Sequence, residues 1–220
     1  MSRPGSSERE TRPRRPGRKP SLTVDDIAEA VLAVGFDHVT VAAVAEQLGV
    51  SASGLYRYIE VRDDLIAIAA DHLISAPPRS DADNWVDLLR EECWARYRSA
   101  ERHPGVVRAI RASTRDSRAA GERNRWMARR LHELGLSAAD ADLAVELVVD
   151  VVDDGIADIA LVIEQVEAEG AAAYAQEAAA LGIPFVEAYL QVAEDPLPLL
   201  ERRIEVLVRG LQAVVEADKR

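Results

Sequence analysis

The chain has 220 residues, of which 48% are hydrophobic, so it can bury a sizeable core. It has no apolar run approaching the roughly 18 residues of a membrane span and no apolar stretch behind its basic N-terminus. We therefore expect a cytoplasmic protein without a membrane segment. Cys93 is the single cysteine, which excludes an intrachain disulfide, and the four histidines lack a ligand spacing. We expect no metal site and no cofactor.

The formal net charge of −11 by itself disfavours a nucleic-acid partner, because Lys and Arg supply most of the affinity for DNA phosphates. The charge is uneven, however, since residues 1–20 carry seven basic side chains against two acidic ones. Their mixture of Pro, Gly, Ser and Arg predicts a disordered basic arm. The arm is either a solubilising tail or a DNA-contacting segment, and its place before the next module favours DNA contact. Its candidate DNA contacts are Arg14, Arg15, Arg18 and Lys19.

The composition, with 5% aromatic residues and long stretches rich in Ala, Leu, Val, Glu and Arg, predicts an all-α fold. Thr23 and Asp26 resemble a capping box, and the apolar residues after them predict a first helix that ends at Gly35. Thr40 is a good N-cap for a second helix, which the chain leaves at Gly49.

Ser51 or Ser53 begins a short third helix, which gives way near Glu60 to a fourth helix that ends at Pro77. The polar break over residues 76–84 separates a small N-terminal module, residues 21–75, from a larger helical domain, residues 76–220. Its predicted helices cover residues 84–101, 105–112, 116–134, 137–168 and 196–217. The long 137–168 helix and the last helix have wide apolar faces. These faces pack either on a second subunit or within the same chain.

Three residues have the spacing of a helix-turn-helix. This motif needs a small residue where two helices cross, a glycine at the turn and an apolar side chain that packs behind the turn. They are Ala45, Gly49 and Leu55. A purely structural helical hairpin is the alternative for this spacing taken alone.

The next residues are more specific, because residues 55–59, Leu-Tyr-Arg-Tyr-Ile, and residues 62–65, Arg-Asp-Asp-Leu, resemble the third and fourth helices of the tetracycline-repressor (TetR) family. The family motif there is Leu-Tyr-x-His-Phe, followed by Lys and Leu. The resemblance runs from about Val24 to Leu73. It implies a helix-turn-helix joined by the fourth helix to helices that enclose a ligand pocket and form a dimer.

The resemblance implies that Tyr56 enters the major groove, while Thr40, Tyr58 and Arg62 hold phosphates. Base contacts would fall to the third helix through Ser51, Ser53 and Arg57. The alternatives are that one tyrosine packs into the module and that Arg57 is a solvated charge.

Two departures from the family pattern weaken this surface, since Tyr58 replaces the usual histidine and the second helix carries Ala42 and Ala43 instead of long polar side chains. Moreover, residues 21–75 hold nine acidic residues against two arginines. We therefore hypothesise that the basic arm supplies much of the nonspecific affinity, which extends the DNA-binding unit from Arg12 to Leu73.

For the pocket, the candidates are Trp94, Arg98, Trp126 and Met127, with plain core packing as the alternative. Asp150 and Asp154 belong to an acidic ridge that either faces solvent or meets a cationic ligand or an Arg across the dimer. A twofold dimer would place two recognition helices about 34 Å apart, which predicts a palindromic operator.

The sequence thus predicts a ligand-responsive transcriptional regulator, most simply a repressor that a small-molecule effector releases from DNA through the fourth helix. The sequence shows neither a grouping of nucleophile and base nor a phosphate-binding loop, so it gives no support for an enzyme. A helical interaction protein without DNA binding is the other alternative.

Overall fold

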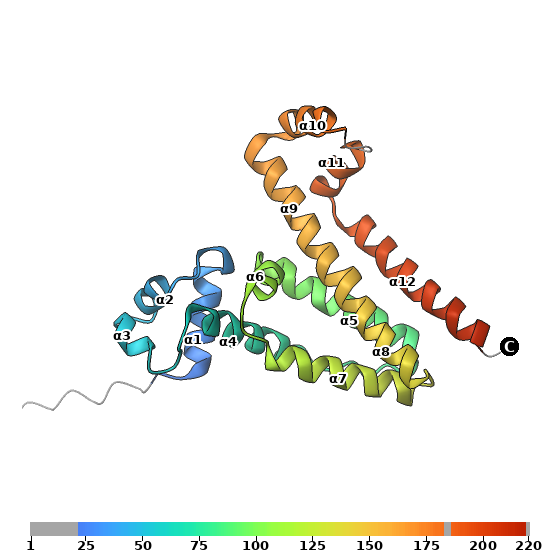
Figure 1. Ribbon diagram of the computed structural model, residues 1–220, viewed down its shortest axis with the longest axis horizontal. Coiled ribbons are helices and arrows are strands. Elements are labelled where there is room, and N and C mark those ends of the chain that lie inside the picture. The colour runs from blue at the N-terminus through green and yellow to red at the C-terminus, as the bar shows by residue number, and fades with distance from the viewer. Residues whose placement is uncertain (1–21, 183–185, 219–220) are drawn as a thin grey trace, which may run out of the picture.

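The computed structural model describes residues 22–182 and 186–218, and all regular elements within these ranges are helical (Figure 1). The all-α prediction is therefore confirmed. The N-terminal elements are α1 (Val24–Val34), η1 (Phe36–His38), α2 (Val41–Gln47), α3 (Ala52–Leu55) and α4 (Arg62–Ser75). The C-terminal helices are α5 (Trp85–Arg102), α6 (Val106–Ala112), α7 (Arg118–Glu133), α8 (Ala138–Leu147), η2 (Val148–Asp153), α9 (Asp154–Glu169), α10 (Ala171–Ala180), α11 (Val186–Glu194) and α12 (Leu197–Asp218). No helix within the described ranges is long and apolar enough to cross a membrane.

The first helix begins as its sequence predicts. The Thr23 hydroxyl accepts the backbone N–H of Asp26 at 3.1 Å, and the Asp26 carboxylate accepts the backbone N–H of Thr23 at 2.7 Å. This capping box satisfies N–H groups that have no partner inside the helix. The buried face of α1, with Ile27 and Val31, packs against α4.

Helix α4 joins the two parts of the molecule. It packs on α1 at one side and on α6 and α7 at the other (Figure 1). Its buried residues, among them Leu65, Ile66 and Ala69, belong to one apolar cluster that continues into α5, α7, α8 and α12. Helix α4 is therefore in direct packing contact with both parts of the molecule.

The predicted single helix over residues 137–168 is interrupted in the structure. Between α8 and α9 lies a π-helical segment, η2, which adds a residue to the helical turn without ending the run. Helical periodicity alone does not reveal such an insertion, since the apolar side continues through it.

The apolar faces of this run and of α12 are largely buried within one chain. Val148, Val152 and Ile156 are at most 8% exposed. The buried residues of α12 are Leu200, Ile204, Leu207, Val208, Leu211 and Val215. Packing within the chain, the alternative to a subunit interface, is therefore correct for these positions. Exposed apolar side chains remain on both segments, Leu143 and Leu161 on the 137–168 run and Val206 and Val214 on α12, where an intermolecular contact could form.

Candidate functional site

The connection between α2 and α3 is a tight turn of the Schellman type. The backbone N–H of Gly49 donates to the carbonyl of Glu46, and that of Val50 donates to the carbonyl of Ala45, both at 3.0 Å. Gly49 has a φ of +64°, a conformation that costs glycine little. Ala45 and Leu55 are 3% and 0% exposed. The predicted small residue, turn glycine and apolar plug thus occupy the positions that a helix-turn-helix needs.

Helix α3 is a single turn whose N-cap is Ser51. The Ser51 hydroxyl oxygen accepts the backbone N–H of Gly54 at 3.1 Å and lies 3.1 Å from the hydroxyl of Ser53. Both serines are exposed. The helical conformation ends at Leu55, so the segment from Tyr56 to Tyr58 continues as a turn.

The residues after α3 present aromatic and basic groups to solvent. The side chains of Tyr56 and Tyr58 are 53% and 38% exposed, so neither is buried in the module. Arg57 is exposed, and its Nε donates to the carbonyl of Gly54 at 3.3 Å. This bond holds the guanidinium beside α3, where its remaining N–H groups are free to donate to a base edge or a phosphate.

Thr40 and Arg62 lie at one edge of the same module. The Thr40 hydroxyl oxygen accepts the backbone N–H of Ala43 at 3.0 Å, which leaves its hydrogen to donate. The Nε of Arg62 donates to the carbonyl of Val39 at 2.9 Å, so the start of α4 is joined to the residue before Thr40. With its side chain 51% exposed, Arg62 can also offer N–H groups to solvent.

Many acidic groups of the N-terminal module face the C-terminal helices. The Asp63 carboxylate accepts the N–H and hydroxyl of Thr114 at 2.9 and 2.8 Å, and these bonds lower the pKa of Asp63. Arg115 pairs with Glu60 and Asp64 at 2.9 and 2.8 Å. Asp71 accepts from Ser117 at 2.7 Å. Four of the nine acidic residues of this module are thus bonded to the segment from Thr114 to Ser117 of the C-terminal domain.

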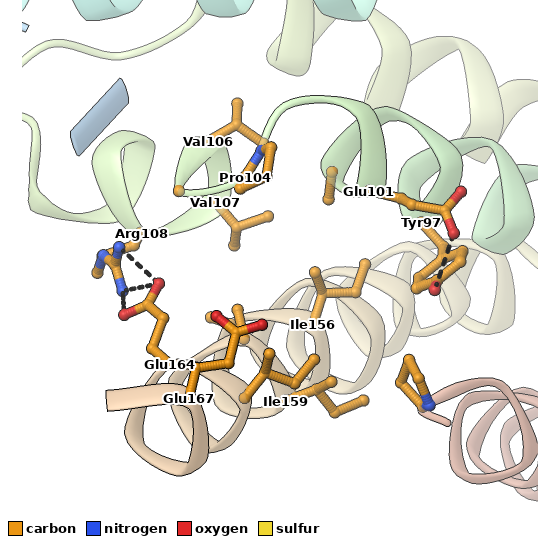
Figure 2. Close-up of a pocket in the computed structure, with 16 residues that line it drawn as sticks. Tyr97, Glu101, Pro104, Val106, Val107, Arg108, Ile156, Ile159, Glu164 and Glu167 are labelled. Atoms are coloured by element: carbon orange, nitrogen blue, oxygen red, sulfur yellow. Dashed lines mark hydrogen bonds and ion pairs between the residues drawn. The ribbon is translucent and has the colours of Figure 1, made fainter. Parts of the chain in front are cut away.

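A cavity of about 410 Å³ lies between α5, α6 and α9 (Figure 2). Its walls are mostly apolar and include Val106, Val107, Ile156, Ile159 and the ring of Tyr97. The charged side chains that line it are Glu101, Arg108, Glu164 and Glu167. The volume falls within the range of roughly 300–1,000 Å³ that is typical of small-molecule sites.

The six predicted ligand residues lie outside the lining of this cavity. Met127 is fully buried in the core, and Trp94 packs edge-on against Tyr97 with ring centroids 5.9 Å apart. Trp126 is covered by the guanidinium groups of Arg79 and Arg123. The other three are Arg98 and Asp150, which are exposed, and Asp154, which pairs with Arg111 of the same chain.

Arg108 connects the cavity to the N-terminal module. Its guanidinium bonds both oxygens of Glu164 at 2.9 to 3.0 Å and one oxygen of Asp37, in η1, at 2.6 Å. These bonds raise the pKa of Arg108 further above its usual range. The backbone at Gly105 also lies close to Asp37. A Cβ at this position would be only 2.5 Å from the Asp37 carboxylate. A cavity wall and the segment before α2 are therefore in direct contact.

The predicted arm contacts, Arg14, Arg15, Arg18 and Lys19, lie outside the described residues. The other predicted DNA contacts are all exposed, and they lie at the starts of α2 and α4, at α3 and in the turn after it. The cavity residues were not predicted, because glutamates on a helix surface give the same pattern as a solvated face. The sequence signal nearest to the cavity is the break at His103, Pro104 and Gly105 between two helices.

Comparison with known proteins gives one related sequence and several similar structures. No protein-family model matches the chain. The HTH-type transcriptional repressor DrrR1 of Streptomyces coeruleorubidus is 31% identical over 107 residues. That match covers 43% of this chain and 38% of the repressor, so the chain spans well under half the length of this relative.

Three solved structures cover nearly the whole fold. BioQ of Mycobacterium smegmatis is 22% identical with a TM-score of 0.63, over 88% of this chain and 99% of BioQ. A TetR from Streptomyces coelicolor is 20% identical with a TM-score of 0.63, over 88% and 99% of the two chains. ActR of Streptomyces coelicolor, a TetR family protein solved with actinorhodin, is 18% identical with a TM-score of 0.66, over 89% and 98%. The chain therefore has the fold of TetR family transcriptional regulators, the family that its sequence resembles.

Proposed function

We propose that this protein belongs to the TetR family and is a ligand-responsive DNA-binding transcriptional regulator, a repressor that a small-molecule effector releases from its operator. The observation that carries the proposal is the surface of the helix-turn-helix, where Ser53, Tyr56 and Arg57 are exposed to solvent close to the turn at Gly49. The names of similar proteins support it. DrrR1 is named a repressor, BioQ has been solved with its double-stranded DNA operator, and ActR has been solved with actinorhodin.

In this proposal the DNA-contacting residues have different roles. Ser51, Ser53 and Arg57 meet base edges in the major groove with Tyr56 beside them. Thr40, Tyr58 and Arg62 bond phosphates at the edge of the groove, where they fix the register of the module on the duplex. The basic residues before Leu22 add charge that the acidic module lacks.

We further propose that the protein binds as a homodimer to a palindromic operator. The exposed side of α12 offers a stripe of small and apolar residues, Val206, Gly210, Ala213 and Ala217, each about one helical turn after the one before. Small residues allow two helices to approach closely, and a twofold axis through this stripe pairs it with itself. The dimer then presents two copies of α3 to half-sites about 34 Å apart.

The effector binds in the cavity between α5, α6 and α9, and its binding reaches the DNA-contacting module by two routes. One route is the ion pair of Arg108 with Asp37. The other is α4, whose Asp63 and Asp71 bond the segment from Thr114 to Ser117. A displacement of α6 moves both contacts together and changes the spacing of the two recognition segments.

The test begins with selection of genomic fragments by the full-length protein, followed by anisotropy titration of the selected duplex. We expect Tyr56→Ala and Arg57→Ala each to weaken binding by about tenfold, as the loss of one good contact does. Tyr189→Ala is the matched control, because Tyr189 on α11 is 41% exposed and takes no part in the proposed interface. Failure to enrich any sequence, or equal affinity of all variants, would contradict the proposal.

A further inference from the structure

The charged groups that line the cavity are unbalanced, because three are carboxylates and one is a guanidinium. The guanidinium of Arg108 is already occupied by Glu164 and by Asp37, which lies outside the cavity. It therefore has little left to offer a ligand. The polar groups that an entering molecule meets are therefore mainly hydrogen-bond acceptors with negative charge.

One end of the cavity is formed by Glu101 and Tyr97 (Figure 2). The Tyr97 hydroxyl donates to Oε1 of Glu101 at 3.3 Å. Burial and the nearby carboxylate raise the pKa of Tyr97, so the phenol stays neutral. No ion pair to Glu101 is formed among the residues that the structure describes. The ring of Tyr97 forms the adjoining wall.

Glu164 and Glu167 form the other end (Figure 2). They are three residues apart on α9, so their carboxylates share one side of the helix and repel each other. Glu164 is paired with Arg108, whereas no ion pair to Glu167 is present within residues 22–182 and 186–218. Between the two ends the wall is apolar, with Val107, Ile156 and Ile159 facing the space.

We propose that this cavity takes an amphipathic organic cation, a molecule with an apolar or aromatic ring body and a protonated or quaternary nitrogen. The ring body packs on the isoleucine and valine side chains, and the nitrogen binds at a carboxylate end, next to Glu167 or Glu101. An anion of the same shape is repelled by both ends. This inference rests on the proposed function only in taking the cavity as the effector site.

The test uses three acridines of one ring skeleton and different charge with the full-length protein in the absence of DNA. At neutral pH, 9-aminoacridine is a cation, acridine is neutral and acridine-9-carboxylate is an anion. Fluorescence titration should give the tightest binding for the cation and the weakest for the anion. Because the carboxylates are partly exposed, we expect a preference of about tenfold for the cation over neutral acridine.

Two double variants separate the cavity charge from the net charge. Glu101→Gln with Glu167→Gln removes two carboxylates from the cavity, and Glu169→Gln with Glu177→Gln removes two exposed ones elsewhere on α9 and α10. Only the first pair should remove the preference for the cation. Ala160→Phe, which fills the cavity from α9, should weaken all three dyes and so place their binding site.

Equal affinity of the three acridines for the unmodified protein would overturn the inference, and so would equal losses in the two double variants. The first comparison needs no variant and is therefore independent of any folding defect. Operator binding is measured separately. Operator binding without a preference for the cation would overturn this inference and leave the regulator proposal intact. Binding of the cation without any DNA binding would refute only the regulator proposal.

Discussion

The buried ion pair between Arg123 and Glu92 leads to a sharp prediction about stability. Nε and Nη2 of Arg123 bond the two oxygens of Glu92 at 2.8 and 2.9 Å. The side chains are 10% and 1% exposed. Nη1 donates to the carbonyls of Ile74 and Pro77, at 3.3 and 3.2 Å, so the same guanidinium holds the end of α4. Removing it therefore affects both the core and the junction.

Arg123→Met leaves the Glu92 carboxylate inside the core without its cation. Breaking one partner of a buried pair costs about 3–5 kcal/mol, a large share of the roughly 5–15 kcal/mol that stabilise a domain. Removing both charges should be much milder, because two apolar side chains of similar volume replace the pair without leaving a buried charge. We therefore expect Glu92→Leu with Arg123→Met to recover most of the lost stability.

The measurement is urea unfolding followed by far-ultraviolet circular dichroism, which reports the helices. Arg118→Met is the matched control, because it breaks the exposed pair with Glu122 on the same helix and should cost less than about 1 kcal/mol. The reasoning is refuted if Arg123→Met stays within about 1 kcal/mol of the unmodified protein. It is also refuted if the double variant is less stable than the single one.

Three further predictions concern the turn, the basic segment and the buried thiol. Leu55→Ala should cost about 2–5 kcal/mol in urea unfolding, because Leu55 is fully buried behind the turn. Deleting residues 1–20 should make the slope of log affinity against log salt shallower in operator titrations. An unchanged slope would refute their contribution to DNA affinity. Burial raises the pKa of Cys93 from 9.0 to about 12, so the folded state keeps a proton that the unfolded chain releases. Stability should therefore fall as the pH rises from 9 toward 12, and Cys93→Ala should make that fall smaller.

The N-terminal module was predictable from the sequence because its signals are local. A hydroxyl at an N-cap, as in Thr23, Thr40 and Ser51, bonds a backbone N–H only three residues away. The Gly49 turn likewise depends on a conformation that one residue type adopts at little cost. These interactions do not depend on tertiary contacts, so the starts of the helices and the turn can be predicted from residue type and spacing.

The cavity was not predictable, because it depends on which helices meet. The apolar face of α9 has the same periodicity whether it meets a second subunit, the core or a ligand. The tertiary structure buries Met127 in the core and packs Trp94 edge-on against Tyr97, which agrees with core packing, the alternative to a pocket role, for these two side chains. The cavity is formed where Gly105, with a φ of +79°, turns the chain from α5 into α6.

The ion pairs of the acidic N-terminal module also bear on the proposed approach of this module to a DNA phosphate backbone. Asp37, Glu60 and Asp64 are paired with Arg108 and Arg115, which come from α6 and the segment after it. Their compensation therefore depends on where α6 lies. A displacement of α6 that lengthens these pairs leaves carboxylates uncompensated on the module that approaches phosphates in the proposed function. It would lower DNA affinity through charge as well as through the spacing of the recognition segments.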